Sequence, residues 1–143
     1  MIKFACENSE KLDQEIATRL GEFNKSRAAW FSNHPHKSKN KSCYAFDGDK
    51  LVGGAVGFVR YNWFYLDLLF VEEAYRKQRI GSQLLRQIED YAKKENLTGV
   101  RLETWDFQAL DFYRANGYDV FGEIKDCPPG SIEYHLMKKL QGW

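Results

Sequence analysis

Residues 63–97, WFYLDLLFVEEAYRKQRIGSQLLRQIEDYAKKENL, place an apolar run, a basic turn and a helix-like segment in direct succession. The apolar run, residues 63–71, contains one charged residue, Asp67, and no basic one. In residues 80–94 the apolar side chains recur at the spacing of one helical face: Ile80, Leu84, Leu85, Ile88 and Ala92. The stretch predicts a strand at 63–71, a turn, and a helix at 80–94 whose other faces carry Arg86, Glu89, Lys93 and Lys94.

The segments around this stretch predict a sheet with helices packed on it. Strands at 43–46 and 51–61 flank DGDK, whose Asp-Gly pair favours a hairpin, so residues 43–71 predict an antiparallel meander. Strands are also expected at 99–105, 118–124 and 131–140, and a short helix at 107–116 ends at Gly117. This order predicts an α/β fold of the α+β type, with a mixed, mostly antiparallel sheet of about six to seven strands flanked by helices.

The N-terminal region gives a weaker pattern. We expect a short strand at 2–6 and two helices within 9–32, with the break between them near Gly21 and Asn24. Residues 32–42, SNHPHKSKNKS, read as a polar loop.

The composition indicates one globular domain spanning residues 1–143. The formal net charge is +1, from 21 basic and 20 acidic residues, which argues against a nucleic-acid partner. Neither a signal-peptide core nor an apolar run of about 18 residues is present, so we expect no membrane partner and a cytoplasmic location. Three widely spaced cysteines without a CxxC pair, and His34 and His36 without a third ligand, predict no metal site.

The turn between the strand and the helix has the chemistry of an anion site. Arg76, Lys77 and Arg79 surround the start of the helix, where cations are unfavourable unless an anion offsets them. The first N–H groups of a helix have no acceptor within the helix and lie at the positive end of its dipole. The spacing therefore favours a phosphate ligand over a merely solvated basic turn.

Two motifs of the chain resemble the GNAT superfamily of N-acetyltransferases. In VEEAYRKQRIGSQLL, residues 71–85, Arg76 and Gly81 stand at the first and last positions of the family's pyrophosphate loop, Arg/Gln-x-x-Gly-x-Gly/Ala. Arg79 replaces the middle glycine, where a long side chain either weakens cofactor binding or points outward while its N–H still donates. ALDFYRANGYDV, residues 109–120, is similar to the family's late helix-turn-strand motif at four positions: Ala109, Tyr113, Gly117 and Tyr118.

The resemblance implies the GNAT acyl-CoA N-acyltransferase fold, acetyl-CoA as co-substrate, and direct transfer of the acetyl group to a primary amine. It implies that strands 63–71 and 99–105 splay apart, with pantetheine bonded to main-chain groups of Leu69, Phe70 and Val71. The diphosphate would bind at the turn and the first helical turn: Arg76, Lys77, Gln78, Arg79, Ile80, Gly81 and Ser82. Tyr113 would lie near the thioester sulfur as the acid for the departing thiolate, and a tyrosine that simply packs on the sheet is the alternative.

Two carboxylates are candidates for the general base that takes a proton from the attacking amine. Strand alternation puts Glu103 on one face of GVRLETW with Arg101 and Trp105. Residues 100–103, VRLE, resemble the LxLE segment of the strand that carries the base in some ribosomal-protein acetyltransferases. Asp67 interrupts an apolar run, where an unpaired carboxylate is costly. For both, a salt bridge with Arg60 or Arg101 is the structural alternative.

The acceptor is expected to be a small-molecule amine, because aromatic rings beside carboxylates suit a cation. The aromatic candidates for binding it are Trp30, Trp63, Tyr65, Trp105 and Tyr134. Two alternatives stay open: a protein lysine or N-terminus as acceptor, and a non-catalytic acyl-CoA-binding sensor. Many proteins of the family dimerise through exposed strand edges, so the resemblance also makes a homodimer an expectation for this chain.

Overall fold

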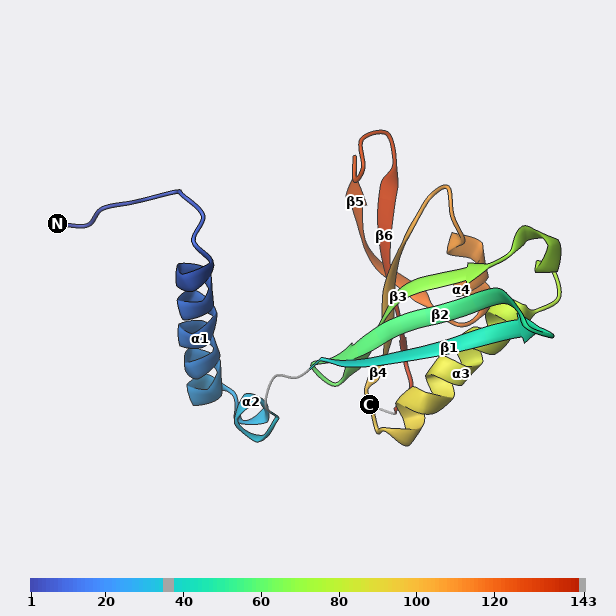
Figure 1. The fold of residues 1–143 in the computed structure, drawn as a ribbon, viewed down its shortest axis with the longest axis horizontal. Coiled ribbons are helices and arrows are strands. Elements are labelled where there is room, and N and C mark those ends of the chain that lie inside the picture. Colours follow the sequence, from blue (N-terminus) through green and yellow to red (C-terminus); the bar gives the residue numbers. More distant parts are fainter. Residues whose placement is uncertain (35–37, 142–143) are drawn as a thin grey trace. The chain divides into compact units, whose positions relative to one another are not determined.

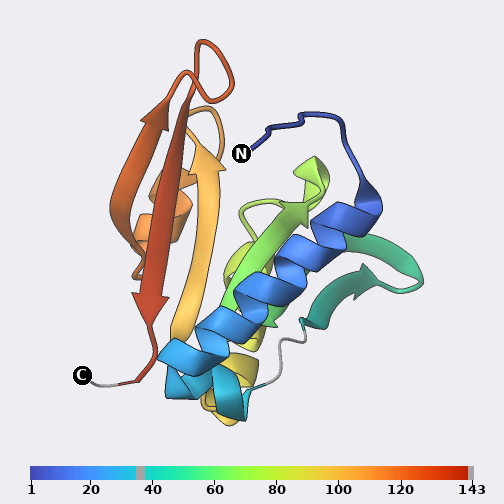
Figure 2. The same ribbon diagram turned by 90° about the vertical axis from the view of Figure 1, so that its left-hand side faces the viewer.

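The structure, a computed structural model, describes residues 1–34 and 38–141. The chain divides into two compact units, Met1–Lys37 and Ser38–Trp143. The first unit holds two helices, and the second holds a sheet with its own helices (Figures 1 and 2). Among the described residues, no helix combines the length and the apolar character needed to cross a membrane. That the whole chain forms one domain stays a prediction.

The first unit contains α1, Glu10–Arg27, and α2, Ala29–Asn33. α1 begins after Ser9, whose hydroxyl accepts a hydrogen bond from the Leu12 N–H at 3.2 Å. Acidic residues in its first turn and basic residues in its last turn both suit the helix dipole. Local contacts at its two ends therefore stabilise α1.

Two expectations for this unit are wrong in detail. The two predicted helices are present, but the break falls at extended Ala28 and not near Gly21 and Asn24. One interior glycine costs a helix only about 1 kcal/mol, which a capped helix of 18 residues tolerates. Residues 2–6 form no strand, so the short apolar pattern there was not sufficient to predict one.

The second unit is a six-stranded sheet with the order β1-β2-β3-β4-β6-β5. All neighbouring strands are antiparallel except β3 and β4, which run parallel. The predicted mixed, mostly antiparallel sheet is confirmed. Its elements are β1 (Lys39–Asp47), β2 (Lys50–Arg60), β3 (Trp63–Val71), the short 3-10 helix Glu73–Tyr75, α3 (Ile80–Lys94), β4 (Gly99–Trp105), α4 (Leu110–Ala115), β5 (Asp119–Lys125) and β6 (Ile132–Lys139).

β1 begins earlier than its sequence suggests. Residues 39–42 were expected in a polar loop, yet they pair with β2 from Lys39↔Val59 to Ser42↔Val56. That expectation is wrong because pairing along β2 outweighs the polar composition of this segment. Lysines are common on edge strands, where they discourage pairing with another chain.

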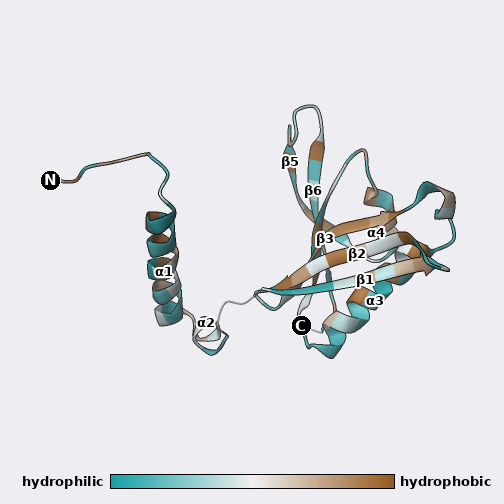
Figure 3. Ribbon diagram, in the orientation of Figure 1, coloured by the Kyte–Doolittle hydropathy of each residue, from teal (hydrophilic) through white to brown (hydrophobic). Residues whose placement is uncertain are grey.

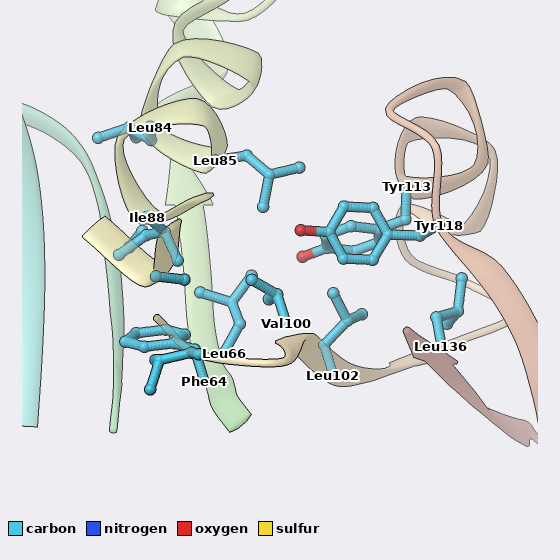
Figure 4. Packing of buried hydrophobic residues seen from close by; sticks show 13 residues of the cluster. Phe64, Leu66, Leu84, Leu85, Ile88, Val100, Leu102, Tyr113, Tyr118 and Leu136 are labelled. Carbon is cyan, nitrogen blue, oxygen red and sulfur yellow. The ribbon is translucent and has the colours of Figure 1, made fainter. Parts of the chain in front are cut away.

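One face of the sheet is covered by α3 and carries the core. In β4 the alternation is as predicted, with Val100, Leu102 and Thr104 buried and the intervening side chains half-buried on the opposite face. Figure 3 shows the hydrophobic residues concentrated along β2 and β3. Figure 4 shows the packing of the buried side chains from the sheet, α3 and the α4 region, among them Phe64, Leu66, Leu84, Leu85, Ile88, Tyr113, Tyr118 and Leu136.

Glu89 is a correction to the expected face of α3. It was placed among the polar faces, but its side chain is buried and meets two polar partners. The Tyr118 hydroxyl donates to one carboxylate oxygen at 2.9 Å, and Lys138 Nζ donates to the other at 3.0 Å. Lys138 Nζ also donates to the Asn116 carbonyl at 3.0 Å. The buried charge is thus compensated, and it ties α3 to the α4–β5 turn and to β6.

Lys138→Met tests this ion pair. Glu89 would keep only the Tyr118 hydroxyl, so we expect the free energy of unfolding to fall by about 2 to 3 kcal/mol. The melting temperature would fall by roughly 5 to 10 °C. Urea unfolding followed by circular dichroism measures the change. The control Lys125→Met, at an exposed position of β5, should change the stability by less than about 0.5 kcal/mol, and equal midpoints for both variants would contradict the assignment.

Candidate active site

β3 and β4 separate halfway along their length. They pair in parallel from Trp63↔Gly99 to Leu66↔Leu102, and both strands then continue without pairing to each other. Figure 2 shows the two strands diverging. Residues 67–71 of β3 therefore present main-chain groups to the gap, where a ligand can bond to them. The predicted splay is present.

A β-bulge at Asp67 accompanies the separation. Leu66 pairs with Gly57 of β2, and the residue after Asp67 pairs with the adjacent Val56, so Asp67 is one residue too many. A bulge reverses the alternation of side chains that follows it. The later residues that pack against the core are Leu69 and Val71. Asp67 itself is exposed, which explains how a carboxylate interrupts an otherwise apolar strand.

A cavity of about 910 Å³ opens where the strands separate. Its walls are the unpaired part of β3, the basic turn, the first turn of α3, the end of β4 and α4. Gln78 does not line it and faces a smaller hollow of about 400 Å³ beside β1. All the other residues predicted to bind the cofactor line the cavity: Leu69, Phe70, Val71, Arg76, Lys77, Arg79, Ile80, Gly81, Ser82 and Tyr113. The contacts of these residues with a cofactor stay a prediction.

The N-terminus of α3 forms one end of the cavity. The helix has neither a side-chain cap nor an acidic residue in its first turn. The Gln83 N–H donates to the Arg79 carbonyl at 3.0 Å as the first helical bond. The N–H groups of Ile80, Gly81 and Ser82 precede that bond and have no acceptor within the helix. This end of the cavity is therefore suited to an anion.

Arg76 connects the anion site to the splayed strand. Its Nε donates to the Val71 carbonyl at 2.9 Å, and its guanidinium lies 5.8 Å from the centre of the Phe70 ring. The cation is thus held at the end of the unpaired segment, next to the N-terminus of α3. One arginine therefore serves both parts of the predicted cofactor site.

Arg79 adopts the left-handed backbone conformation that a glycine would adopt at this position of the turn. Arg79 has φ +61° and ψ 19°, and Lys77 also has a positive φ, +67°. The left-handed conformation costs an L-residue about 1 to 2 kcal/mol, and glycine adopts it freely. Arg79 therefore preserves the shape of the loop at the cost of strain, and its side chain is exposed. Gly81 has a different role, since a Cβ there would lie 3.3 Å from the Phe112 ring and separate α3 from α4.

Tyr113 lies on the α4 side of the cavity with 7% of its surface exposed. Its ring packs edge-on against Phe112 and Tyr118, with centroid distances of 5.1 and 5.9 Å. Burial raises the pKa of the Tyr113 hydroxyl to about 12. The hydroxyl therefore keeps its proton at neutral pH, as a proton donor requires.

Glu103 lies at the point where β4 leaves β3, and it lines the cavity. The Tyr65 hydroxyl donates to Glu103 Oε2 at 2.8 Å. Burial raises the pKa of Tyr65, and the hydrogen bond to Glu103 and the charges of Glu103 and Asp67 raise it further. Tyr65 therefore remains a donor that orients the Glu103 carboxylate.

The salt-bridge alternative for the two carboxylates finds no support. Among the described residues, neither Asp67 nor Glu103 forms an ion pair with Arg60 or Arg101. Arg101 instead lies over the Tyr65 ring at 5.0 Å from its centre. Arg60 bonds the hydroxyl of its neighbour Tyr61. Both carboxylates remain available at the cavity.

A second acidic residue and a histidine adjoin Glu103. β4 and β6 pair so that Glu103 lies opposite His135, whose Nδ1 is 3.9 Å from Glu103 Oε1. Glu133 Oε1 lies 2.9 Å from His135 Nε2. The sequence alone did not indicate that His135 and Glu133 adjoin Glu103. Their alternate positions on β6 place both side chains on one face of the strand, but only the β4–β6 register shows that this face meets Glu103.

The predicted acceptor aromatics are not brought together as a group. Tyr65 contacts Glu103, and Trp105 lines the cavity with its ring stacked on Phe107 at 6.0 Å. Trp63 lies beside Gly99 at the paired start of β3 and does not line the cavity. Tyr134 packs against the core, and Trp30 belongs to the first unit. Phe107 and Gln108 of the cavity wall were missed, because the sequence placed them in a helix at 107–116, whereas α4 begins at Leu110 and both residues lie in the turn before it.

Comparison with known proteins defines the class of this fold and cavity. The acetyltransferase (GNAT) family matches residues 7–118, and the chain belongs to this family. It is 41% identical over 92 residues to blasticidin-S acetyltransferase of Streptomyces morookaense, covering 64% of this chain and 68% of that protein. The predicted enzyme class, an N-acetyltransferase, is confirmed.

Two solved structures show the same fold. An acetyltransferase of Bacillus cereus superposes with a TM-score of 0.84 at 27% identity, covering 96% of this chain and 98% of the other. An aminoglycoside 6′-N-acetyltransferase, solved with coenzyme A, superposes with a TM-score of 0.67 at 18% identity and covers 100% and 99% of the two chains. At that identity the second likeness concerns the fold alone.

The strain at Arg79 is testable by comparing two substitutions. Arg79→Gly and Arg79→Ala remove the same charge, but only glycine relieves the left-handed backbone. We expect Arg79→Gly to be more stable than Arg79→Ala by up to about 1 kcal/mol, measured by urea unfolding. Equal unfolding midpoints would mean that the turn does not hold residue 79 at positive φ.

The buried tyrosines should make the protein sensitive to alkali. The folded state raises the pKa of Tyr113 from its usual value near 10 to about 12, so the folded state binds the proton more tightly. The resulting stability is fully present below about pH 10 and is lost as the pH rises toward 12. Urea midpoints at about pH 8 and about pH 11 measure the fall, and Tyr113→Phe should reduce it. An unchanged fall in that variant would contradict the assignment to Tyr113.

Proposed function

We propose that this protein transfers the acetyl group of acetyl-CoA directly to the primary amine of a small molecule. The observation that carries the proposal is the unpaired segment of β3 ending beside the uncapped, basic N-terminus of α3. Both features belong to one cavity of about 910 Å³. Similarity to blasticidin-S acetyltransferase supports a small-molecule acceptor, and the coenzyme A complex of a protein with the same fold supports the co-substrate.

The co-substrate would use the two features in different ways. Pantetheine amides would pair with the main-chain groups of Leu69–Val71 that face the gap, as an added strand does at a sheet edge, with the Val71 carbonyl shared with Arg76. The diphosphate would accept hydrogen bonds from the first N–H groups of α3. Arg76 and Lys77 would add charge-assisted bonds to its oxygens. The basic turn and the apolar strand thus serve the two ends of one ligand.

Acetyl transfer requires a neutral amine. An alkyl ammonium with a pKa of about 10.4 is only about 0.04% neutral at pH 7, which corresponds to about 4.6 kcal/mol. We assign Glu103 as the general base, because the Tyr65 hydroxyl orients its carboxylate at the mouth of the gap. Asp67 is exposed on the bulge and acts as a second negative charge near the acceptor.

The step balances with these residues. Glu103 takes one proton from the ammonium, and the amine nitrogen then attacks the thioester carbonyl to form a C–N bond. The tetrahedral intermediate collapses with cleavage of the C–S bond. Tyr113 donates its proton to the departing thiolate, and the second amine proton leaves to solvent. Glu103 then releases its proton to solvent, from which Tyr113 recovers its own. The products are the N-acetyl compound and free coenzyme A.

The acceptor site would favour a cation. Glu103, Glu133 and Asp67 supply negative charge, and the stacked rings of Trp105 and Phe107 supply an aromatic surface beside it. The cytoplasmic location and the absence of nucleic-acid partners remain proposals that follow from the sequence, and a homodimer remains a proposal that follows from the family resemblance.

The proposal is tested first by ligand-induced stabilisation. Acetyl-CoA at about 100 times its Kd should stabilise the protein by about 2.7 kcal/mol. The melting temperature would rise by roughly 5 to 10 °C. A panel of small amines would then be screened by release of the coenzyme A thiol. Stabilisation without turnover of any amine, peptide lysine or peptide N-terminus would favour a sensor and overturn the enzymatic proposal.

Exchanging the carboxylates separates the base from its neighbour. Glu103→Gln should lower kcat/KM by about 10²- to 10⁴-fold, because an amide takes no proton. Asp67→Asn is the matched control and should act mainly on KM. Equal losses of kcat in both variants would contradict the assignment of Glu103.

The proton donor is tested in the same assay. Tyr113→Phe should leave acetyl-CoA binding intact and lower kcat by about 10²-fold or more, since the thiolate would depart without a proton. Wild-type turnover in this variant across the pH range would exclude the role.

A further inference from the structure

Glu103, Glu133 and His135 bring three metal-ligating side chains together on the sheet face opposite the core. One ligand atom from each lies within 4.8 Å of the others. Glu103 belongs to β4, and the other two occupy alternate positions of β6, directly opposite Glu103 and two residues before that point. Neighbouring strands of a sheet hold such positions firmly. The cluster is therefore built on rigid elements and does not depend on a loop.

The charge of the cluster is poorly compensated. The side chains are half-buried to buried, with 31% of Glu103, 12% of Glu133 and 25% of His135 exposed. Within residues 1–34 and 38–141, no lysine or arginine forms an ion pair with either carboxylate, and both carboxylates lie near the His135 imidazole. Glu133 approaches Nε2 of the imidazole and Glu103 approaches Nδ1, so a single ion would use one of the two ring nitrogens together with the carboxylates.

His135 Nε2 and Glu133 Oε1 lie slightly closer together than two ligands on one ion, and His135 Nδ1 and Glu103 Oε1 lie farther apart, so a shared ion requires small side-chain movements. His135 Nε2 lies 2.9 Å from Glu133 Oε1, yet the directions of the two groups make no hydrogen bond. Nε2 is also closed off from solvent and finds no other hydrogen-bond partner among the described residues. Two ligands about 2.1 Å from one metal ion, at angles near 90° to 109°, lie about 3.0 to 3.4 Å apart.

We propose that Glu103, Glu133 and His135 form a binding site for a divalent transition-metal ion, with zinc as the best match. Imidazole and carboxylate together suit zinc, whose open sites use three protein ligands and a water. The Tyr65 hydroxyl holds Glu103 Oε2 and leaves the other carboxylate oxygen for the ion. The site would regulate acetyl transfer without being required for it, and it departs from the sequence expectation of no metal site.

The site has a consequence for the reaction, which rests on the proposed role of Glu103 as base. A carboxylate bound to zinc does not accept a proton from the amine. The ion also occupies the acidic surface that would attract the ammonium group. Zinc should therefore inhibit acetyl transfer in competition with the amine and leave the affinity for acetyl-CoA unchanged.

Binding is measured on the full chain, independently of activity. Zinc chloride is titrated by calorimetry into protein first treated with a chelator, and cobalt(II) absorption reports the ligand field. We expect one ion per chain with a Kd in the micromolar range. His135→Gln and Glu133→Gln should each weaken binding by at least about tenfold. The proposal would be overturned if the wild type bound no zinc, or if these two variants bound zinc as tightly as the wild type does.

Matched controls separate this site from other metal ligands. His34→Gln and Glu123→Gln make the same chemical changes outside the cluster, and both should bind zinc as the wild type does. Cys127 needs its own control, because its Sγ lies 3.7 Å from Glu133 Oε2. Cys127→Ser should keep zinc binding within about threefold, and loss of binding in this variant would replace the three-ligand site with a thiolate site.

The two proposals fail in different ways. Zinc binding that depends on His135 and Glu133, in a protein that acetylates no amine, would retain the metal site and remove the proposed base. Acetyl transfer that is insensitive to zinc, in a protein that binds no ion, would retain the enzyme and remove the site.

Discussion

The parallel pairing of β3 and β4 stops at Leu66↔Leu102, and the rest of the candidate site depends on that interruption. Before it, the two strands share a continuous core with α3. After it, the free edge of β3 faces a cavity, and a main-chain edge that no strand satisfies is a strong binding surface. The bulge at Asp67 lets β3 stay paired to β2 while it leaves β4. One extra residue therefore converts a structural strand into one wall of a site.

The two faces of β4 carry different parts of the protein. Leu102 and Thr104 belong to the core, and Glu103 points to the opposite face, where Tyr65 and His135 meet it. Because side chains alternate along a strand, the core fixes the position of the carboxylate without touching it. On the core side, the ion pair of Glu89 and Lys138 also holds elements of the site in position, since it joins α3 to β6.

Much of the second unit was predictable from the sequence because its signals are local. The helix at 80–94 has an apolar stripe, the hairpin has an Asp-Gly turn, and the cofactor loop has a recognisable spacing. The errors occur where distant partners decide. Residues 39–42 became a strand through pairing with β2, and Glu89 became buried through Tyr118 and Lys138. The predictions of a strand at 2–6 and of a helix break near Gly21 were wrong because a short sequence pattern is a weak signal on its own.

By itself, the sequence determined the order of the elements in the second unit, the basic turn before α3 and a helix start suited to an anion. These follow from periodicity, from turn chemistry and from charges close together in the chain. The tertiary structure alone decided where β3 and β4 part, and that Glu103 meets Tyr65, His135 and Glu133. Strand register sets both, and register arises from contacts between residues that are far apart in sequence.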